Sequence, residues 1–169
     1  FKGACAYSSD AYIRSLEVPN GLKLCVMINA SEILDDGNYN EHKLDQLFPG
    51  DSKTSNIAII RIASHTHEFV QAIQAVKNLK LKGFIVGFNL MQVSECEPKK
   101  LSILAKEASK YPLDVLYFAD SLGNMDSEKV LNVIKLFRQH WDGELGIHAH
   151  DNMAMGLFNS LFALKNSVT

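Results

Sequence analysis

Five short apolar runs recur along the chain, and polar residues interrupt them only rarely. They cover residues 22–28, 57–63, 84–90, 115–119 and 145–148. Apolar runs of this length, without regular alternation, are typical of strands in parallel sheets that are buried on both faces. The pattern therefore predicts five such strands.

Between the runs, apolar residues repeat at the spacing of one helix face, as in a helix that packs on a sheet. The repeats comprise Phe69, Ile73, Val76 and Leu79, then Leu101, Leu104 and Ala108, then Val130, Val133, Ile134 and Phe137. Asp126, Ser127 and Glu128 predict the start of the third helix, because acidic residues stabilise its positive end. Residues 141–143 predict the end of this third helix, before the next strand.

The order of these elements predicts the fold class. Strand starts recur every roughly 27 to 35 residues, the length of a βα repeat. Such alternation is typical of an α/β fold with a parallel sheet and right-handed crossovers. Both a (β/α)8 barrel, the TIM barrel, and an open doubly wound sheet meet that description.

The chain shows no linker rich in proline or glycine, so we expect a single domain over residues 1–169. One polar stretch, residues 35–49, begins with the turn signal Asp36-Gly37 and predicts a short helix around His42 to Phe48. The chain opens at Phe1 on an apolar stretch without an initiator methionine. We therefore expect the domain to be incomplete.

Composition narrows the class of partner. The 169 residues are 47% hydrophobic with a formal net charge of -2, which gives a sizeable core and no general attraction for nucleic acid or anionic membranes. No apolar run reaches the roughly 18 to 20 residues that span a bilayer, and no signal peptide is evident. Cys5, Cys25 and Cys96 form no CxxC pair, which fits a reducing compartment. We expect a cytoplasmic protein with a small-molecule ligand.

The sharpest chemical signal is an HxH pattern within residues 146–152, at the end of the last apolar run. Residues two apart on a strand share a face, so His148 and His150 can bind one metal ion together. Alternatively, the two histidines lie at the strand end without binding a ligand and make ordinary hydrogen bonds. Their position favours the metal site, because ligands bind at the carboxyl ends of parallel strands. Imidazole suits zinc, manganese, iron, cobalt or nickel, and a third oxygen ligand would favour manganese.

A second signal follows the run that ends at Ala119. Asp120 can support a ligand or transfer a proton, and Ser121 can hydrogen-bond a substrate carboxylate. Spacing alone favours a simpler interpretation, in which both side chains satisfy backbone donors of a loop and Gly123 permits its turn.

Two further strand ends carry polar residues. Arg61 lies inside an apolar run and is expected to meet a carboxylate, because an unpaired buried charge is costly. His65 and His67 lie where a helix is expected to begin, so they are not expected to share a face, and capping or core packing is favoured over metal binding. The amides of Asn89 and Gln92 can bind substrate oxygens.

The chain has no P-loop, GxGxxG, GxSxG or HExxH motif, so nucleotide binding and triad hydrolysis lack support. Residues 146–156, followed by Asn159-Ser160, resemble the final metal motif of the HMG-CoA lyase-like metal-dependent barrels, and most closely that of the 4-hydroxy-2-oxovalerate aldolases. Residues 120–125 resemble the aspartate-bearing loop of these enzymes, and residues 61–65 resemble an earlier strand end.

This resemblance implies a partial (β/α)8 barrel in which the five runs are strands three to seven. Gly3 to Tyr7 would then be the exit from strand two. The metal-binding aspartate and catalytic arginine of strand one would precede Phe1, and strand-eight residues would follow Thr169. We expect the isolated chain to be inactive, because an incomplete barrel lacks ligands and exposes sheet edges.

The resemblance also implies a metal-dependent aldolase that cleaves a carbon-carbon bond of a hydroxy-oxo acid through a metal-stabilised, pyruvate-type enolate. His148 and His150 would hold the divalent cation, with Mn²⁺ favoured over Mg²⁺, Co²⁺ and Zn²⁺. Ser121 and Asp120 would be catalytic, although the counterpart of Asp120 has different duties in lyases and aldolases. The substrate, a 2-oxo acid, would be bound by Ser121, Asn89 and His65.

Two other functions remain open on the sequence. One is an acyl-CoA lyase or Claisen-type condensing enzyme of the same superfamily, and the other is a non-catalytic barrel that keeps the histidine motif. The resemblance further implies either a homo-oligomer or a partner dehydrogenase that receives the aldehyde.

Overall fold

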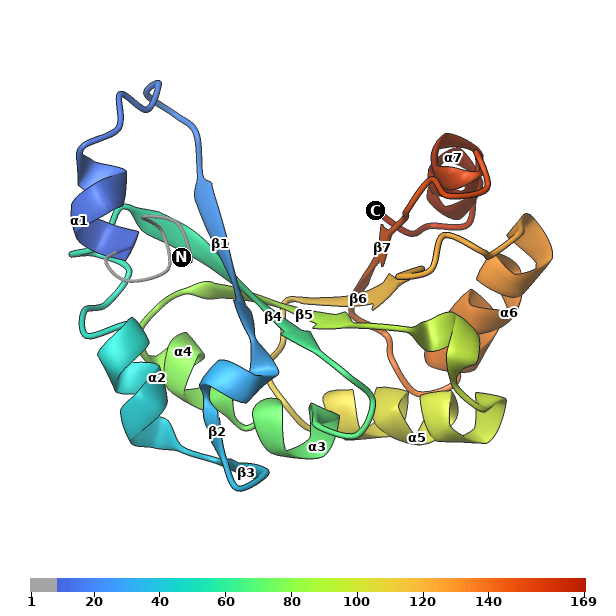
Figure 1. Cartoon of the computed structure of the whole chain (residues 1–169), viewed down its shortest axis with the longest axis horizontal. Coiled ribbons are helices and arrows are strands. Elements are labelled where there is room, and N and C mark those ends of the chain that lie inside the picture. Colours follow the sequence, from blue (N-terminus) through green and yellow to red (C-terminus); the bar gives the residue numbers. More distant parts are fainter. Residues whose placement is uncertain (1–8) are drawn as a thin grey trace.

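A sheet of five parallel strands forms the centre of the computed structural model, which describes residues 9–169 (Figure 1). The segment predicted as the exit from strand two, Gly3 to Tyr7, lies outside these residues. The strands follow one another across the sheet in chain order. They are β1 (Leu24–Asn29), β4 (Ile57–Ser64), β5 (Ile85–Leu90), β6 (Val115–Ala119) and β7 (Glu144–His148).

This strand order decides between the two architectures that the sequence left open. A doubly wound sheet reverses its strand order at a switch point, whereas consecutive strands of a (β/α)8 barrel are neighbours. The chain therefore forms part of a TIM barrel, as predicted. Each of the five predicted strands is confirmed, with bounds that differ by at most a few residues.

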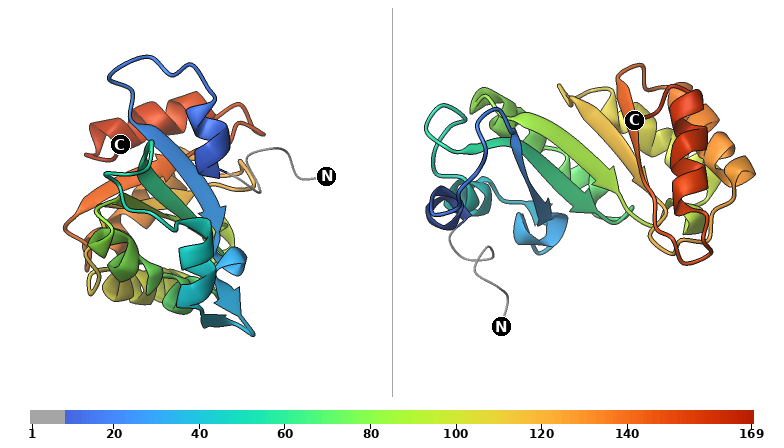
Figure 2. Two further views of the ribbon diagram at one scale, coloured as in Figure 1. Left: turned by 90° about the vertical axis from the view of Figure 1, so that its left-hand side faces the viewer. Right: turned by 90° about the horizontal axis from the view of Figure 1, so that it is seen from above.

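The helices lie along the outer side of the curved sheet, and β1 and β7 form its two edges (Figures 1 and 2). No helix within residues 9–169 is long and apolar enough to cross a membrane. The helices are α1 (Ser9–Arg14), α2 (Glu41–Leu47), α3 (Phe69–Ala72), α4 (Ala75–Leu81), α5 (Pro98–Ala108), α6 (Ser127–Arg138) and α7 (Gly156–Lys165). Two 3-10 turns, Ala30–Glu32 and Val93–Glu95, and a small hairpin of β2 (Leu34–Asp35) and β3 (Asn38–Tyr39) complete the described part.

Local signals in the sequence place several of these boundaries correctly. The Asp126 carboxylate accepts the backbone N–H of Lys129 at 2.8 Å and caps α6. Asp36 and Gly37 have φ angles of 45° and 79°, as a tight hairpin turn between β2 and β3 requires. The short helix predicted around His42 is α2.

The single helix predicted from Phe69 to Leu79 is wrong in one respect, because the structure divides it into α3 and α4. Between them, the backbone N–H groups of Gln74 and Val76 bond to the carbonyls three residues earlier. Such bonds tighten the backbone into a 3-10 turn and interrupt the α-helical pattern. The apolar stripe survives the interruption, since Ile73 and Val76 are both fully buried.

The two faces of the sheet differ in burial, which corrects the expectation that both would be covered. On the helix side, Ile60, Ile62 and Phe88 are fully buried. On the opposite side, Met27 is 53% exposed and Cys25 is also exposed. Helices pack on only one side of the sheet, so its inner face is open among residues 9–169.

A single aromatic ring organises much of this inner face. Tyr117 on β6 stands between two glycines, Gly87 on β5 and Gly146 on β7, and an added Cβ at either position would press on the ring. The Arg61 guanidinium carbon lies 4.0 Å from the centre of the same ring, a favourable cation-π contact. Both glycines therefore make room for the Tyr117 side chain.

We expect Gly146→Ala to destabilise the chain. A Cβ at this position would lie 2.2 Å from Cδ1 of Tyr117, and such overpacking typically lowers the free energy of unfolding by about 1–3 kcal/mol. Urea denaturation of the single variants and of the double variant with Tyr117→Ala measures the effect. Gly146→Ala should lower the free energy of unfolding much less in the Tyr117→Ala background than in the wild type. An equal decrease in both backgrounds would contradict this explanation.

Candidate functional site

The predicted site residues gather at one edge of the sheet because the parallel strands share one direction. Asn89 on β5 is paired with Tyr117 on β6, and Ala119 at the end of β6 is paired with His148 on β7. The loops that follow these strands therefore leave the sheet from the same edge, which carries His65 after β4. This edge is the carboxyl end of the strands, where barrel enzymes bind their ligands.

His148 and His150 lie side by side, as the HxH spacing predicts. β7 ends at His148, and His150 follows in the loop, yet their ring centres are only 5.1 Å apart with an interplanar angle of 35°. Neither ring makes a hydrogen bond to any residue of the described part. Burial lowers the pKa of His148, and the charges of Arg61 and His150 lower it further. The neutral imidazole, which is the form that binds metal ions, is therefore favoured.

The loops after β6 and β7 are locked against each other around this histidine pair. The backbone N–H of Asp120 donates to the carbonyl of His148 at 3.0 Å. Farther along, the Asn152 side chain donates to the Leu122 carbonyl at 2.8 Å. Gly123 has a φ of 60°, and a Cβ there would lie 2.8 Å from the Asn152 backbone nitrogen. Glycine is thus required both by backbone conformation and by the close approach of the loops.

Asp120 is buried, with 1% of its surface exposed, and both carboxylate oxygens accept backbone hydrogen bonds. The donors are the N–H groups of Asn124 and Met125, each at 3.1 Å. These contacts match the simpler interpretation, in which the aspartate satisfies backbone donors of its loop. Its predicted catalytic role stays a prediction.

Ser121 and His65 are joined through one residue that follows β5. The Ser121 hydroxyl oxygen accepts the backbone N–H of Gln92 at 3.0 Å. The Gln92 side-chain oxygen lies 3.0 Å from Nδ1 of His65. Three strand-end loops therefore meet at Gln92, which is itself exposed. The sequence singled out its amide, but not its contacts to the two neighbouring loops.

Arg61 does not meet a carboxylate within residues 9–169, contrary to expectation. Its Nη2 donates to the side-chain oxygen of Asn89 at 3.0 Å, and the guanidinium lies over Tyr117. The nearby ring and amide replace the expected ion pair. Asn89 is only 3% exposed, and the contact to Arg61 occupies its side-chain oxygen, so the predicted substrate contact would use the amide nitrogen.

His65 and His67 also differ from expectation, because their rings stack at 5.7 Å with an interplanar angle of 13°. The residues just before α3 form a turn that is not part of the helix. In this turn, the Glu68 carboxylate accepts the backbone N–H of His65 at 3.0 Å. A two-residue spacing can share a side in a turn, although it cannot on a helix.

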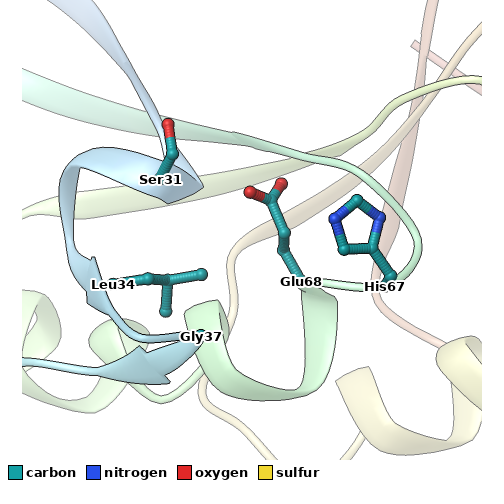
Figure 3. A pocket seen from close by; sticks show the side chains of 5 residues that line it. All are labelled: Ser31, Leu34, Gly37, His67 and Glu68. Atoms are coloured by element: carbon teal, nitrogen blue, oxygen red, sulfur yellow. The ribbon is translucent and has the colours of Figure 1, made fainter.

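Two hollows lie beside these residues. The first, of about 270 Å³, opens between the ends of β1 and β4, and the side chains in Figure 3 surround it. They belong to Ser31, Leu34, Gly37, His67 and Glu68. The intervening strands β5 and β6 separate this hollow from the histidine pair on β7. A second hollow, of about 450 Å³, is lined by Thr66, Gln92, Glu95, Cys96, Glu97 and Lys100.

The described part supplies two candidate metal ligands, His148 and His150, rather than a complete set. No group of three or more histidine, cysteine, aspartate or glutamate side chains converges within residues 9–169. A cation at His148 and His150 would take its other ligands from elsewhere, such as a substrate or water.

The model of the HMGL-like family matches residues 53–169. Among curated relatives, 4-hydroxy-2-oxovalerate aldolase 4 of Rhodococcus opacus (strain B4) is 31% identical over 115 residues, which is 68% of this chain and 33% of that protein. The corresponding aldolase of Brevibacillus brevis (strain 47 / JCM 6285 / NBRC 100599) is 28% identical over 131 residues, 73% of this chain and 38% of that protein. The matched part thus spans only about a third of these relatives.

Solved structures give the same picture of the fold. The N-terminal domain of a proposed aldolase from Bacteroides vulgatus has a TM-score of 0.76 at 29% identity, over 96% of this chain and 50% of that one. The Bacillus subtilis HMG-CoA lyase has a TM-score of 0.75 at 12% identity, over 96% of this chain and 56% of that one. At this identity the likeness concerns the fold alone. With the family model covering more than half of its length, the chain belongs to the HMGL-like family, as its motifs indicate.

Proposed function

We propose that the protein is a divalent-metal-dependent aldolase that cleaves a 4-hydroxy-2-oxo acid into pyruvate and an aldehyde. The observation that carries this proposal is the pair of imidazoles at the carboxyl edge of the sheet. Their ring centres are 5.1 Å apart, and neither ring bonds to another residue of the described part. The names of the relatives in the same family support the reaction class.

The donor set fits a divalent cation. His148 and His150 offer two imidazoles without competing hydrogen bonds in the described part, and the lowered pKa of His148 keeps that ring neutral. Oxygen ligands from a 2-oxo acid would complete the coordination and favour Mn²⁺ among the candidates. When bound, such a cation supplies Lewis-acid stabilisation for the negative charge that develops on the 2-oxo group.

The rest of the edge suits an anionic substrate. Cleavage removes the proton of the 4-hydroxyl group, breaks the C3–C4 bond and leaves its electron pair on the pyruvate fragment, which then takes a proton at C3. Arg61 lies close enough to His148 for its charge to lower the pKa of that ring. The positive charge of Arg61 would therefore help to stabilise negative charge that develops close to His148. Ser121, which is half-buried at the same edge of the sheet, is proposed to hold the carboxylate.

Pyruvate release from 4-hydroxy-2-oxovalerate by the full-length protein tests the reaction. We expect turnover with added Mn²⁺, and its loss after treatment with a chelator. Cleavage of HMG-CoA in place of the hydroxy-oxo acid would support the acyl-CoA lyase alternative. A protein with neither bound metal nor turnover would support the non-catalytic barrel.

His148→Ala and His150→Ala should each remove most of the bound metal. Loss of a direct ligand should weaken metal affinity by more than the 10–100-fold that follows the loss of an outer partner. Metal analysis after dialysis measures the effect, with His42→Ala as the control, since that histidine is exposed on α2. Unchanged metal content in both strand-end variants would exclude this pair as the metal site.

Ser121→Ala should raise the KM for the 2-oxo acid about tenfold, because one hydrogen bond to a charged group contributes about 1.5 kcal/mol. Steady-state kinetics measure the change. Ser109→Ala removes a hydroxyl that, among residues 9–169, bonds only to the Lys106 carbonyl on α5, so its kinetics should match the wild type. A Ser121→Ala variant with an unaltered KM would argue against a carboxylate contact at this residue.

A further inference from the structure

Gln92 occupies a backbone conformation that few side chains adopt. Its φ and ψ angles are 55° and 39°, in the left-handed region. This region is unfavourable for residues other than glycine, asparagine and aspartate, and it persists where the surroundings fix it. The Gln92 N–H points to Ser121 in the next loop, while its side chain reaches His65 in the previous one. The conformation thus serves two contacts at once.

The contact to His65 determines which ring nitrogen carries the proton. An amide oxygen can only accept a hydrogen bond, so Nδ1 of His65 must be the donor. In a neutral ring the other nitrogen, Nε2, then holds a free lone pair. No residue in the described part hydrogen-bonds to Nε2. Of the neighbouring residues, Glu68 accepts the His65 backbone N–H, and the His67 ring stacks on the His65 ring.

The contact between Gln92 and Ser121 leaves the Ser121 hydroxyl as a hydrogen-bond donor, the opposite of the acceptor role of Nε2 in His65. Because Ser121 Oγ already accepts the N–H of Gln92, the hydroxyl hydrogen is directed away from that donor. A hydroxyl has one hydrogen and can donate it to another acceptor, such as a carboxylate oxygen. Ser121 is therefore prepared as a donor, and His65 as an acceptor.

We propose that Gln92 is a positioning residue that assigns these opposite roles and so matches the two ends of a hydroxy-oxo acid. Ser121 donates to the carboxylate, which has no hydrogen of its own, and Nε2 of His65 accepts from the substrate hydroxyl. This inference rests on the proposed function for the identity of the substrate. The arrangement of the two protein groups can be tested without it.

The first experiment measures the tautomer of His65 by ¹⁵N NMR of the full-length protein without substrate. We expect the Nδ1–H form in the wild type and a shift toward the Nε2–H form, which free imidazole favours, in Gln92→Gly. Glycine accepts a φ of 55° and retains the backbone N–H that Ser121 needs. Gln92→Asn, which also tolerates this conformation but is shorter, should give the same shift.

Gln139→Gly is the matched control, since the side chain of that exposed glutamine accepts a hydrogen bond from Ser102 and, within the described residues, bonds to no histidine ring. It should leave the His65 signals unchanged. An Nε2–H tautomer in the wild type, or an unchanged tautomer in Gln92→Gly, would overturn the proposal whatever the protein catalyses.

The second experiment compares two ligands, because pyruvate carries the carboxylate but no hydroxyl. Gln92→Gly should raise the KM for the hydroxy-oxo acid about tenfold, which is the effect of losing one hydrogen bond. The inhibition constant of pyruvate should stay within about twofold of the wild-type value. Ser121→Ala should weaken both ligands. Equal losses for both ligands in Gln92→Gly would point to a merely structural role and overturn the proposal. If neither ligand binds, the proposed function fails, and the NMR result alone decides the role of Gln92.

Discussion

Parallel hydrogen bonding between neighbouring strands is the constraint on which the site depends. Each strand from β4 to β7 enters the sheet at the same end, so side chains far apart in the sequence leave it at a common edge. The pairing of Ala119 with His148 continues beyond the sheet, because the next N–H, that of Asp120, also bonds to β7. The position of the first histidine is therefore set by backbone bonds and does not depend on its own ring.

Backbone groups and neutral amides fix the loops, and within residues 9–169 no ion pair contributes to the contacts around the histidine pair. The buried Asp120 carboxylate is satisfied by two N–H groups of its own loop, which offsets the cost of burying its charge. The Asn152 amide then joins this loop to the next. Such short contacts hold side chains in place without adding charges that would compete for a ligand.

The sequence predicts the strands and the histidine pair because both are encoded within a few residues. An apolar run indicates a buried strand, and the HxH spacing indicates that the two histidine side chains lie on the same side of the chain. The partners of Arg61 and the link from Ser121 to Gln92 depend instead on how separate loops meet. No local pattern distinguishes an amide and a ring from a carboxylate as the partner of an arginine. The stacking of His65 on His67 was missed because a turn, which tertiary packing permits, replaces the helix start that the residue types favour.

The charge around the histidine pair bears on how the proposed cation and the proposed anionic substrate would bind. Among the described residues, the Arg61 guanidinium lies close enough to lower the pKa of His148. The Asp120 oxygens are already occupied by backbone donors. A divalent cation beside Arg61 adds like charge, which is unfavourable unless an anion shares the site. A 2-oxo acid brings that negative charge and supplies oxygen ligands as well. We therefore expect each of the two to strengthen the binding of the other, since such coupling is reciprocal.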